Sequence, residues 1–399
     1  MGHSMAVSRM EERMDFSLTD EQELLIESAK EYAERYFDED SCRAAYDNHH
    51  ISIEQAMAYR EAGFMYLGLP EELGGVPVDK LTEVLLVEKL HEFTGVSLPF
   101  VTDFNTITDV IDFGTQEQQA KIMDVINNVE STCVACSAIS EPAAGSDNNA
   151  MTCVTKKQAD GTYLLNGQKT WVTLGGLSVY TMVVAKDEDP SYENDKYSLW
   201  LVKNGCDGFT IGHLDKVGQQ SIPFVDCFFD NVVLTEADRL GNPGEGWKLL
   251  MKKLEFERML VVASSLGLAQ AAMNDAAAYA SERICFGKPI AKLSAIQNHL
   301  CEMENILDNV RMRLYRVTSM IANGESTRLE SALLKGYACR ELTKVADLAM
   351  SIYAAIGYTK EIRVGRIWND LRGNEMGGGT TEIMEYIAGR QLVKKYKKN

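Results

Sequence analysis

The chain has 399 residues, 45% of them hydrophobic, so it is long enough to bury a core shared by two or three structural units. Its formal net charge of −18 argues against general nucleic-acid binding, which needs a basic face. No apolar run approaches the roughly 18 residues that cross a bilayer, and the first residues lack the apolar stretch of a signal peptide. We therefore expect no membrane insertion and a cytoplasmic location. A natural-looking start lies at Met14, and residues 1–13 resemble in part an expression scar.

Cysteine and histidine spacing gives little support to a metal site. Cys133 and Cys136 form the one C-x-x-C among nine cysteines, without a second pair or a nearby histidine. A strand would point these two side chains to opposite faces. We expect no bound metal.

The residue pattern changes character twice along the chain. Thr19 and Gln22 form a capping box before a helical period that continues to about residue 130. Short β-rich runs follow, divided by the turn signals Asp160-Gly161 and Asn166-Gly167. The helical period then returns. The sequence predicts an α+β multi-domain protein with an N-terminal helical domain (14–130), a middle β-barrel or sheet domain (131–240) and a C-terminal helical bundle (241–399).

The usual nucleotide-binding loops are missing from the sequence. No strand is followed by G-x-G-x-x-G and a helix, and there is no P-loop. The glycine-rich GNPGEG of residues 241–246 precedes a helix and is interpreted as its entry turn. A nucleotide cofactor would therefore use another architecture.

Five motifs follow one another along the chain: SEPAAGSD (140–147), KTWVT (169–173), LEFER (254–258), ERICFGKPI (282–290) and RIWNDLRGNEMGGGTTEIM (366–384). In this order they resemble the acyl-CoA dehydrogenase family, and the resemblance covers essentially residues 14–395. The resemblance implies FAD as cofactor and an acyl-CoA or enoyl-CoA substrate. Oxidation of an acyl-CoA removes a proton from Cα and a hydride from Cβ, so a base and flavin N5 are needed on opposite sides of the substrate.

The first two motifs imply the flavin-binding residues. By resemblance Ser140 and Thr173 meet the flavin ring, Ser146 lies near the pyrophosphate, and Trp171 packs against the isoalloxazine. Gly145 lets the backbone approach the cofactor closely. The alternative for Trp171 is an ordinary core residue.

Three later residues complete the implied cofactor site. Arg283, Cys285 and Phe286 match a segment that in the family reaches the FAD of a neighbouring subunit, where a guanidinium suits a pyrophosphate. Thr380 is the threonine of the C-terminal flavin-contacting motif. The resemblance thus implies a homo-oligomer, most often a tetramer.

The catalytic base stands at an unusual position. Many family members carry it in Glu-Gly-Thr, but the matching position here is Gly378, which cannot accept a proton. A subset that includes isovaleryl-CoA and long-chain enzymes has it on a helix, where Glu257 stands. Glu257 has Leu254 and Leu260 on its helix face and therefore looks more buried than Glu255. We predict Glu257 as the base, with Arg258 orienting it or contacting nearby backbone.

Departures from the family pattern bear on the cofactor. Ser351, Ala354 and Ala355 replace the usual Gln-x-x-Gly-Gly, and Ser294 replaces a frequent glutamine, so we expect looser FAD binding.

The acyl group and the direction of the reaction stay open at this level. Within the family, the sequence pattern most resembles the crotonobetainyl-CoA reductase branch. That branch reduces its enoyl-CoA with electrons from an electron-transferring flavoprotein. Two alternatives compete: an oxygen-using oxidase or monooxygenase of the same fold, and a non-catalytic relative that binds acyl-CoA or a partner.

Overall fold

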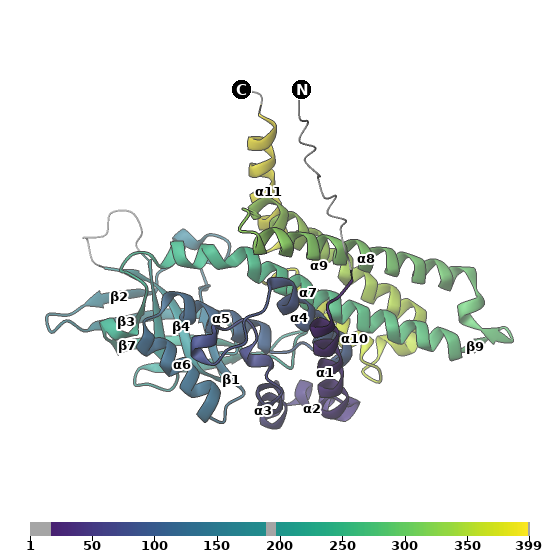
Figure 1. The fold of residues 1–399 in the computed structure, drawn as a ribbon, viewed down its shortest axis with the longest axis horizontal. Helices are drawn as coiled ribbons and strands as arrows, with labels where there is room; N and C mark the ends of the chain where they lie inside the picture. The colour runs from purple at the N-terminus through teal and green to yellow at the C-terminus, as the bar shows by residue number, and fades with distance from the viewer. Residues whose placement is uncertain (1–16, 189–196, 398–399) are drawn as a thin grey trace, which may run out of the picture.

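The computed structural model describes residues 17–188 and 197–397, which form helices, then a sheet, then helices (Figure 1). The proposed start at Met14 and residues 1–13 lie outside these ranges. The three-part α+β architecture is as the sequence predicts.

Serine, threonine and aspartate caps begin most of the N-terminal helices. Thr19 and Gln22 form the predicted capping box, and Ser52 with Gln55 and Thr115 with Gln118 repeat it. The elements are α1 (Asp20–Tyr36), α2 (Glu39–Asp47), α3 (Ile53–Glu61), η1 (Phe64–Tyr66), η2 (Glu71–Leu73), α4 (Lys80–Thr94), α5 (Phe100–Phe113) and α6 (Gln116–Asn128).

The middle of the chain forms one mixed, eight-stranded sheet. Its main order is β6-β7-β3-β2-β4-β5-β8, and β1 pairs in parallel with β4. β1 and β2 pair with successive stretches of β4, around residues 178–183 and 186–187. The strands are β1 (Cys133–Ala138), β2 (Val154–Lys157), β3 (Tyr163–Thr173), β4 (Ser178–Asp187), β5 (Tyr197–Lys203), β6 (Phe209–Leu214), β7 (Phe224–Leu234) and β8 (Arg239–Leu240).

One turn prediction in this region is wrong. Asp160-Gly161 does connect two antiparallel strands, β2 and β3, but Asn166-Gly167 lies inside β3, where the pairing with β7 shifts register. Gly167 has φ of 137°, and a Cβ there would lie 2.7 Å from the Cys153 Cα. Gly167 therefore permits a β-bulge and a close approach of two backbone segments, and the chain does not reverse its direction there.

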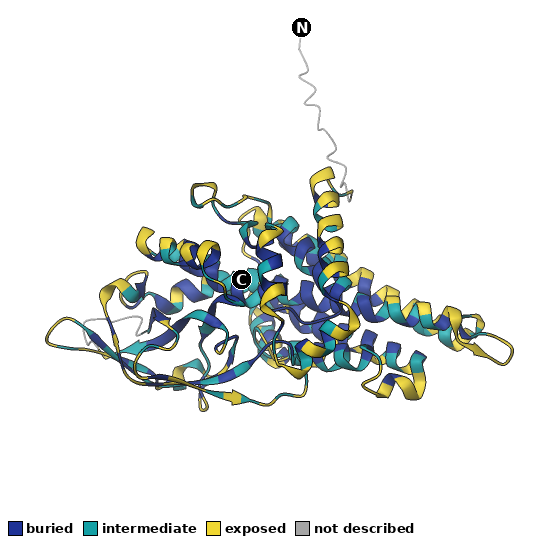
Figure 2. Cartoon of the chain, turned by 90° about the horizontal axis from the view of Figure 1, so that it is seen from below, coloured by how far each residue is buried: buried dark blue, intermediate teal, exposed yellow. Residues whose placement is uncertain are grey.

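Long helices dominate the C-terminal part, and α7 alone runs for 37 residues. A small hairpin of β9 and β10 lies at its far end, and its residues are among the most exposed (Figure 2). The elements are α7 (Gly246–Glu282), β9 (Ile284–Cys285), β10 (Lys288–Pro289), η5 (Ile290–Lys292), α8 (Ser294–Ala322), α9 (Arg328–Tyr353), η6 (Ala354–Tyr358), α10 (Val364–Asn374) and α11 (Thr381–Tyr396); η3 (Asn148–Ala150) and η4 (Glu236–Asp238) lie in the sheet region.

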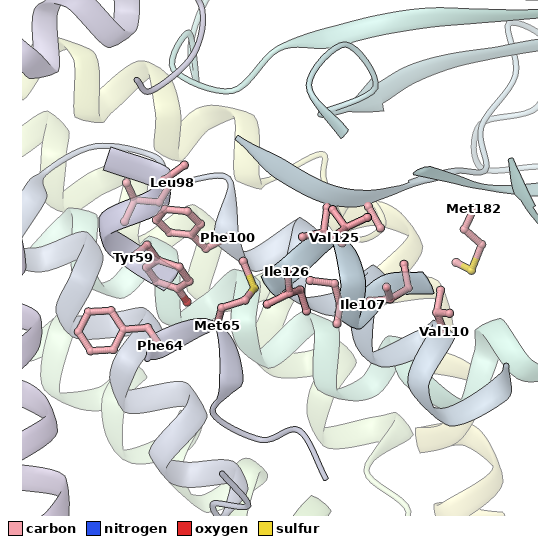
Figure 3. Close-up of a cluster of buried hydrophobic side chains, with 14 of the residues drawn as sticks. Tyr59, Phe64, Met65, Leu98, Phe100, Ile107, Val110, Val125, Ile126 and Met182 are labelled. Carbon is pink, nitrogen blue, oxygen red and sulfur yellow. The ribbon is translucent and has the colours of Figure 1, made fainter. Parts of the chain in front are cut away.

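Hydrophobic packing joins the three parts. One cluster, partly drawn in Figure 3, runs from the N-terminal helices to the adjoining strands, for example from Ile107 to Met182. A second fills the space between α7, α8, α9 and α10, and a third lies within the sheet. Helix α7 contacts both α4 and α9, so it lies between the N-terminal helices and the rest of the bundle.

The described ranges contain neither a membrane-spanning helix nor a cluster of metal ligands. None of the helices placed there is long and apolar enough to cross a membrane. No group of three or more potential metal ligands occurs among these residues. Cys133 and Cys136 are fully buried free thiols, and burial raises the pKa of both.

Candidate functional site

The loop that follows β1 contains Ser140, Gly145 and Ser146, and a buried ion pair fixes its base. Glu141 Oε1 accepts a hydrogen bond from Lys169 Nζ at 2.8 Å, and the loop also bonds to β3 where Ser140 O accepts from Thr170 N at 2.9 Å. Burial alone would raise the pKa of Glu141, but Lys169 and backbone N–H groups hold it below its usual range. The loop is thereby tied to the strand that contains Trp171 and Thr173.

Glu141 and Lys169 are structural residues that the sequence analysis did not single out. Both are buried, and Glu141 Oε2 also accepts from the Thr152 N–H and hydroxyl. Losing one partner of such a pair would leave an unpaired buried charge. Their positions in the sequence could have indicated this role, because both residues lie inside the first two motifs of the family resemblance.

Trp171 projects from the sheet instead of joining its core. The β3–β7 pairing shifts between Lys169 and Val172, and Trp171 has a positive φ of 58° at this irregularity. Its side chain is 60% exposed, which excludes the core alternative. Thr173, at the end of the strand, is half-buried.

The surface of the neighbouring loop is open. A Cβ on Gly145 would meet no atom within 4 Å, and Ser146 is exposed. An uncovered indole beside hydroxyl groups and accessible backbone suits a planar aromatic cofactor with a phosphate-bearing tail. These residues fit a flavin nucleotide, whose site would face this loop and the end of β3.

Two glutamates on α7 differ in their hydrogen bonds. By exposed surface Glu255 and Glu257 are both half-buried, but the Glu257 carboxyl lies deep enough that burial raises its pKa. Glu255 accepts from Thr327 N at 3.0 Å and from the Thr327 hydroxyl at 2.7 Å, at the start of α9. The Glu257 carboxylate makes no hydrogen bond to any described residue. Glu255 is therefore engaged, whereas Glu257 is available.

Electrostatics around Glu257 favour a proton acceptor. Burial raises the pKa of Glu257, and the positive charges of Arg258 and Lys335 oppose that rise. Arg258 is 6% exposed, and its Nε has no hydrogen-bond partner in the described part of the chain. The backbone contact predicted for Arg258 is therefore not made by its Nε. The positive charge of Arg258 lowers the pKa of Glu257.

The glycine turn before α11 lies against α7 close to Glu257. A Cβ built on Gly378 would lie 3.7 Å from the Val261 Cγ2, and Val261 is one helical turn after Glu257. A carboxylate at position 257 and a carboxylate at position 378 would therefore point into the same region. Thr380 caps α11, where its side chain accepts from Ile383 N at 3.3 Å.

Lys335 on α9 holds this turn and was missed at the sequence level. Its Nζ donates to Gly379 O at 2.6 Å and to Glu375 O at 3.1 Å, and the side chain is completely buried. Burial lowers the pKa of Lys335. A lone lysine in a helical period gives no sign of such a role, because its partners lie about forty residues further along the chain.

Arg283, Cys285 and Phe286 lie far from this region. They occupy the exposed hairpin at the end of α7, and the Phe286 side chain is 86% exposed. At about 1.5 Å per helical residue, Arg283 lies roughly 40 Å from Glu257. Within one chain these residues do not join the group around Glu257.

Ala354, which stands where the family pattern has a glycine, adopts a backbone conformation that suits glycine. Ala354 has φ of 56°, a region that alanine rarely occupies, and it follows the end of α9. Ser351, Ala354 and Ala355 are all exposed, and the Ser351 hydroxyl donates to Asp347 O at 3.1 Å.

Comparison with known proteins agrees with this arrangement of helices, sheet and helices. Models of the N-terminal, middle and C-terminal domains of acyl-CoA dehydrogenase match residues 19–130, 136–232 and 244–393. The probable acyl-CoA dehydrogenase YdiO of Escherichia coli K12 is 37% identical over 96% of this chain and 99% of its own.

Solved structures give the same result. Butyryl-CoA dehydrogenase from Megasphaera elsdenii superimposes with a TM-score of 0.87 at 27% identity, over 95% of this chain and 100% of the other. An acyl-CoA dehydrogenase from Slackia heliotrinireducens gives 0.84 at 30% identity, over 96% and 99%. The chain belongs to the acyl-CoA dehydrogenase family. It is an FAD-dependent oxidoreductase that acts on acyl-CoA thioesters.

Proposed function

We propose that Glu257 is the base that removes the α-proton of the acyl-CoA substrate. Its carboxylate is half-buried, unengaged within the described structure and next to the turn that contains Gly378. Glu255, two residues earlier, bonds to Thr327 instead. The proposal depends on one observation. The Glu257 carboxylate has no hydrogen-bond partner among the described residues, and it lies beside Gly378, which has no side chain to act as a base.

The residues around Glu257 have separate proposed roles in the reaction. When bound, FAD supplies the two-electron acceptor for the hydride from the β-carbon. Ser140, Gly145, Ser146, Trp171, Thr173 and Thr380 are the residues that we propose to hold it. Arg258 and Lys335 keep Glu257 ionised enough to accept a proton, while burial strengthens it as a base.

We further propose that the hairpin of Arg283 and Phe286 reaches the cofactor of a second copy of the chain. Its distance from Glu257 along α7 excludes a role in its own site, and the exposed Phe286 lacks a packing partner that would explain its position. A homo-oligomer, a tetramer by family resemblance, would place it there. The electron partner that we propose is an electron-transferring flavoprotein; a protein of that name from Acidaminococcus fermentans is among the similar structures, with a TM-score of 0.88 at 27% identity.

The test compares two glutamates on the same helix. Purified wild type, Glu257→Gln and Glu255→Gln are titrated anaerobically with saturated and α,β-unsaturated acyl-CoAs while the visible flavin spectrum is recorded. We expect Glu257→Gln to slow flavin reduction by about a hundredfold or more while it still binds FAD. Glu255→Gln should still reduce its flavin, because that residue bonds to α9. Equal rates in wild type and Glu257→Gln would contradict the assignment.

A further inference from the structure

A small cavity lies among α4, α5, α7 and the segment from α3 to η1. It has a volume of about 30 Å³, whereas one water needs on the order of 10–15 Å³. Aromatic side chains, among them Tyr59, Phe64 and Phe100, form much of its wall (Figure 3). Leu260 closes it on the α7 side, three residues after Glu257.

One carboxylate faces this largely apolar space. Glu83 lines the cavity and is 5% exposed. Its Oε1 accepts from Lys80 Nζ at 2.7 Å, whereas its buried Oε2 has no hydrogen-bond partner among the described residues. Two other titratable residues line the wall: Tyr59, and His91, which bonds to the Val87 carbonyl and the Leu98 N–H. Among the buried polar side-chain atoms of the described wall residues, Glu83 Oε2 is the one without a hydrogen-bond partner.

An unsatisfied buried carboxylate oxygen is costly, about 1–3 kcal/mol or more, so a ligand group or water is expected beside it. The ligand would be a donor, because a carboxylate oxygen accepts. It would be neutral, because Lys80 already balances the charge of Glu83. Burial raises the pKa of Glu83, which also disfavours an uncompensated negative charge there.

The cavity stands next to the proposed proton-transfer site. Glu257 and Leu260 are neighbours on one side of α7, and α5 packs against α7 beside them. An acyl group with its α-carbon at Glu257 can extend between these helices to Leu260. We propose that the cavity receives the far end of the acyl group, and that the substrate ends in a hydroxyl or another neutral hydrogen-bond donor, which Glu83 accepts. This inference rests on the function proposed for Glu257.

The experiment measures kcat/KM for flavin reduction by a ladder from butyryl- to octanoyl-CoA and by the ω-hydroxy counterparts. At one chain length we expect the ω-hydroxy substrate to be favoured by at least about tenfold in the wild type, since a site built for a donor rejects the analogue that lacks it. Glu83→Leu should reverse that preference. The matched control is Asp109→Asn on α5, another buried carboxylate with an unpartnered oxygen but outside the cavity wall. Its charge interacts with Glu257, so the variant changes the rate with both substrates alike and should leave their ratio unchanged.

The outcomes separate this inference from the function on which it rests. Flavin reduction that depends on Glu257 but shows no ω-hydroxy preference at any length would mean that water alone fills the cavity, and would overturn the inference. That comparison uses the wild type and so does not depend on the folding of Glu83→Leu. Failure of every acyl-CoA to reduce the flavin, or reduction undiminished in Glu257→Gln, would instead overturn the proposed function.

Discussion

At the scale of single residues, two neighbouring positive charges, those of Arg258 and Lys335, lower the pKa of Glu257 against the effect of burial. Lys335 contributes in two ways, because it holds the turn before α11 through two carbonyls and lowers the pKa of Glu257 by its charge. A nearby positive charge favours the ionised form of a buried carboxylate, which is the form that accepts a proton.

Replacement of Lys335 by methionine should therefore change the pH profile. Removing the positive charge raises the pKa of Glu257 further, and because the ionised form accepts the proton, the acidic limb of the rate of flavin reduction moves to higher pH. Activity at low pH falls more than activity at high pH, and the lost hydrogen bonds cost about 1–3 kcal/mol of stability. Lys335→Arg, which keeps the charge, is the control. An unshifted limb in Lys335→Met would show that the lysine is only structural.

At the scale of elements, one aspartate connects segments from all three parts of the chain. Asp370 on α10 accepts from the Tyr46 hydroxyl of α2, from Ser97 Oγ at 2.7 Å and from the backbone N–H of Gln219 in the loop before β7. Gln219 also donates to Asn374 at 2.7 Å, and Asn374 donates to Ser265 of α7 at 2.9 Å. The position of the sheet relative to α7 thus depends on this network.

We expect Asp370→Ala to lower the free energy of unfolding by about 3 kcal/mol or more, because one buried and two partly buried donors lose their acceptor. Urea unfolding followed by circular dichroism measures it. Asp308→Ala, at an exposed position of α8, should change stability by no more than about 0.5 kcal/mol. Similar midpoints for both variants would show that the network contributes nothing.

At the scale of the whole molecule, the long helix α7 separates the two regions for which we propose a function. Glu257 lies in its first half among buried residues, whereas Arg283 and Phe286 lie at an exposed tip. A site that requires both ends needs more than one copy of the chain.

Removal of the Arg283 guanidinium should therefore weaken FAD retention only in the assembled protein. We expect Arg283→Ala to keep the oligomeric state seen by light scattering but to lose FAD more readily on dilution, by about tenfold in Kd, because a charge-assisted contact to phosphate is removed. Arg316→Ala, at an exposed position of α8, serves as a surface control. A wild type that is monomeric and binds FAD fully would contradict the proposal.

Local patterns determined much of this protein from the sequence alone. The capping box at Thr19, the hairpin at Asp160-Gly161 and the order of helices, strands and helices depend on residues a few positions apart, which is why they could be predicted. The family and its cofactor followed from motifs that keep their order along the chain. The choice of Glu257 over Gly378 also came from the sequence and stays a prediction.

Tertiary structure decided what depends on contacts between distant residues. The bond from Glu255 to Thr327, the ion pair between Glu141 and Lys169, and the clamp of Lys335 on the glycine turn join positions that no local period relates. Asn166-Gly167 has the composition of a turn, yet pairing with β7 and the nearness of Cys153 make it a bulge. Side-chain pairing across the fold, and not local propensity, determined which carboxylates are engaged and which are free.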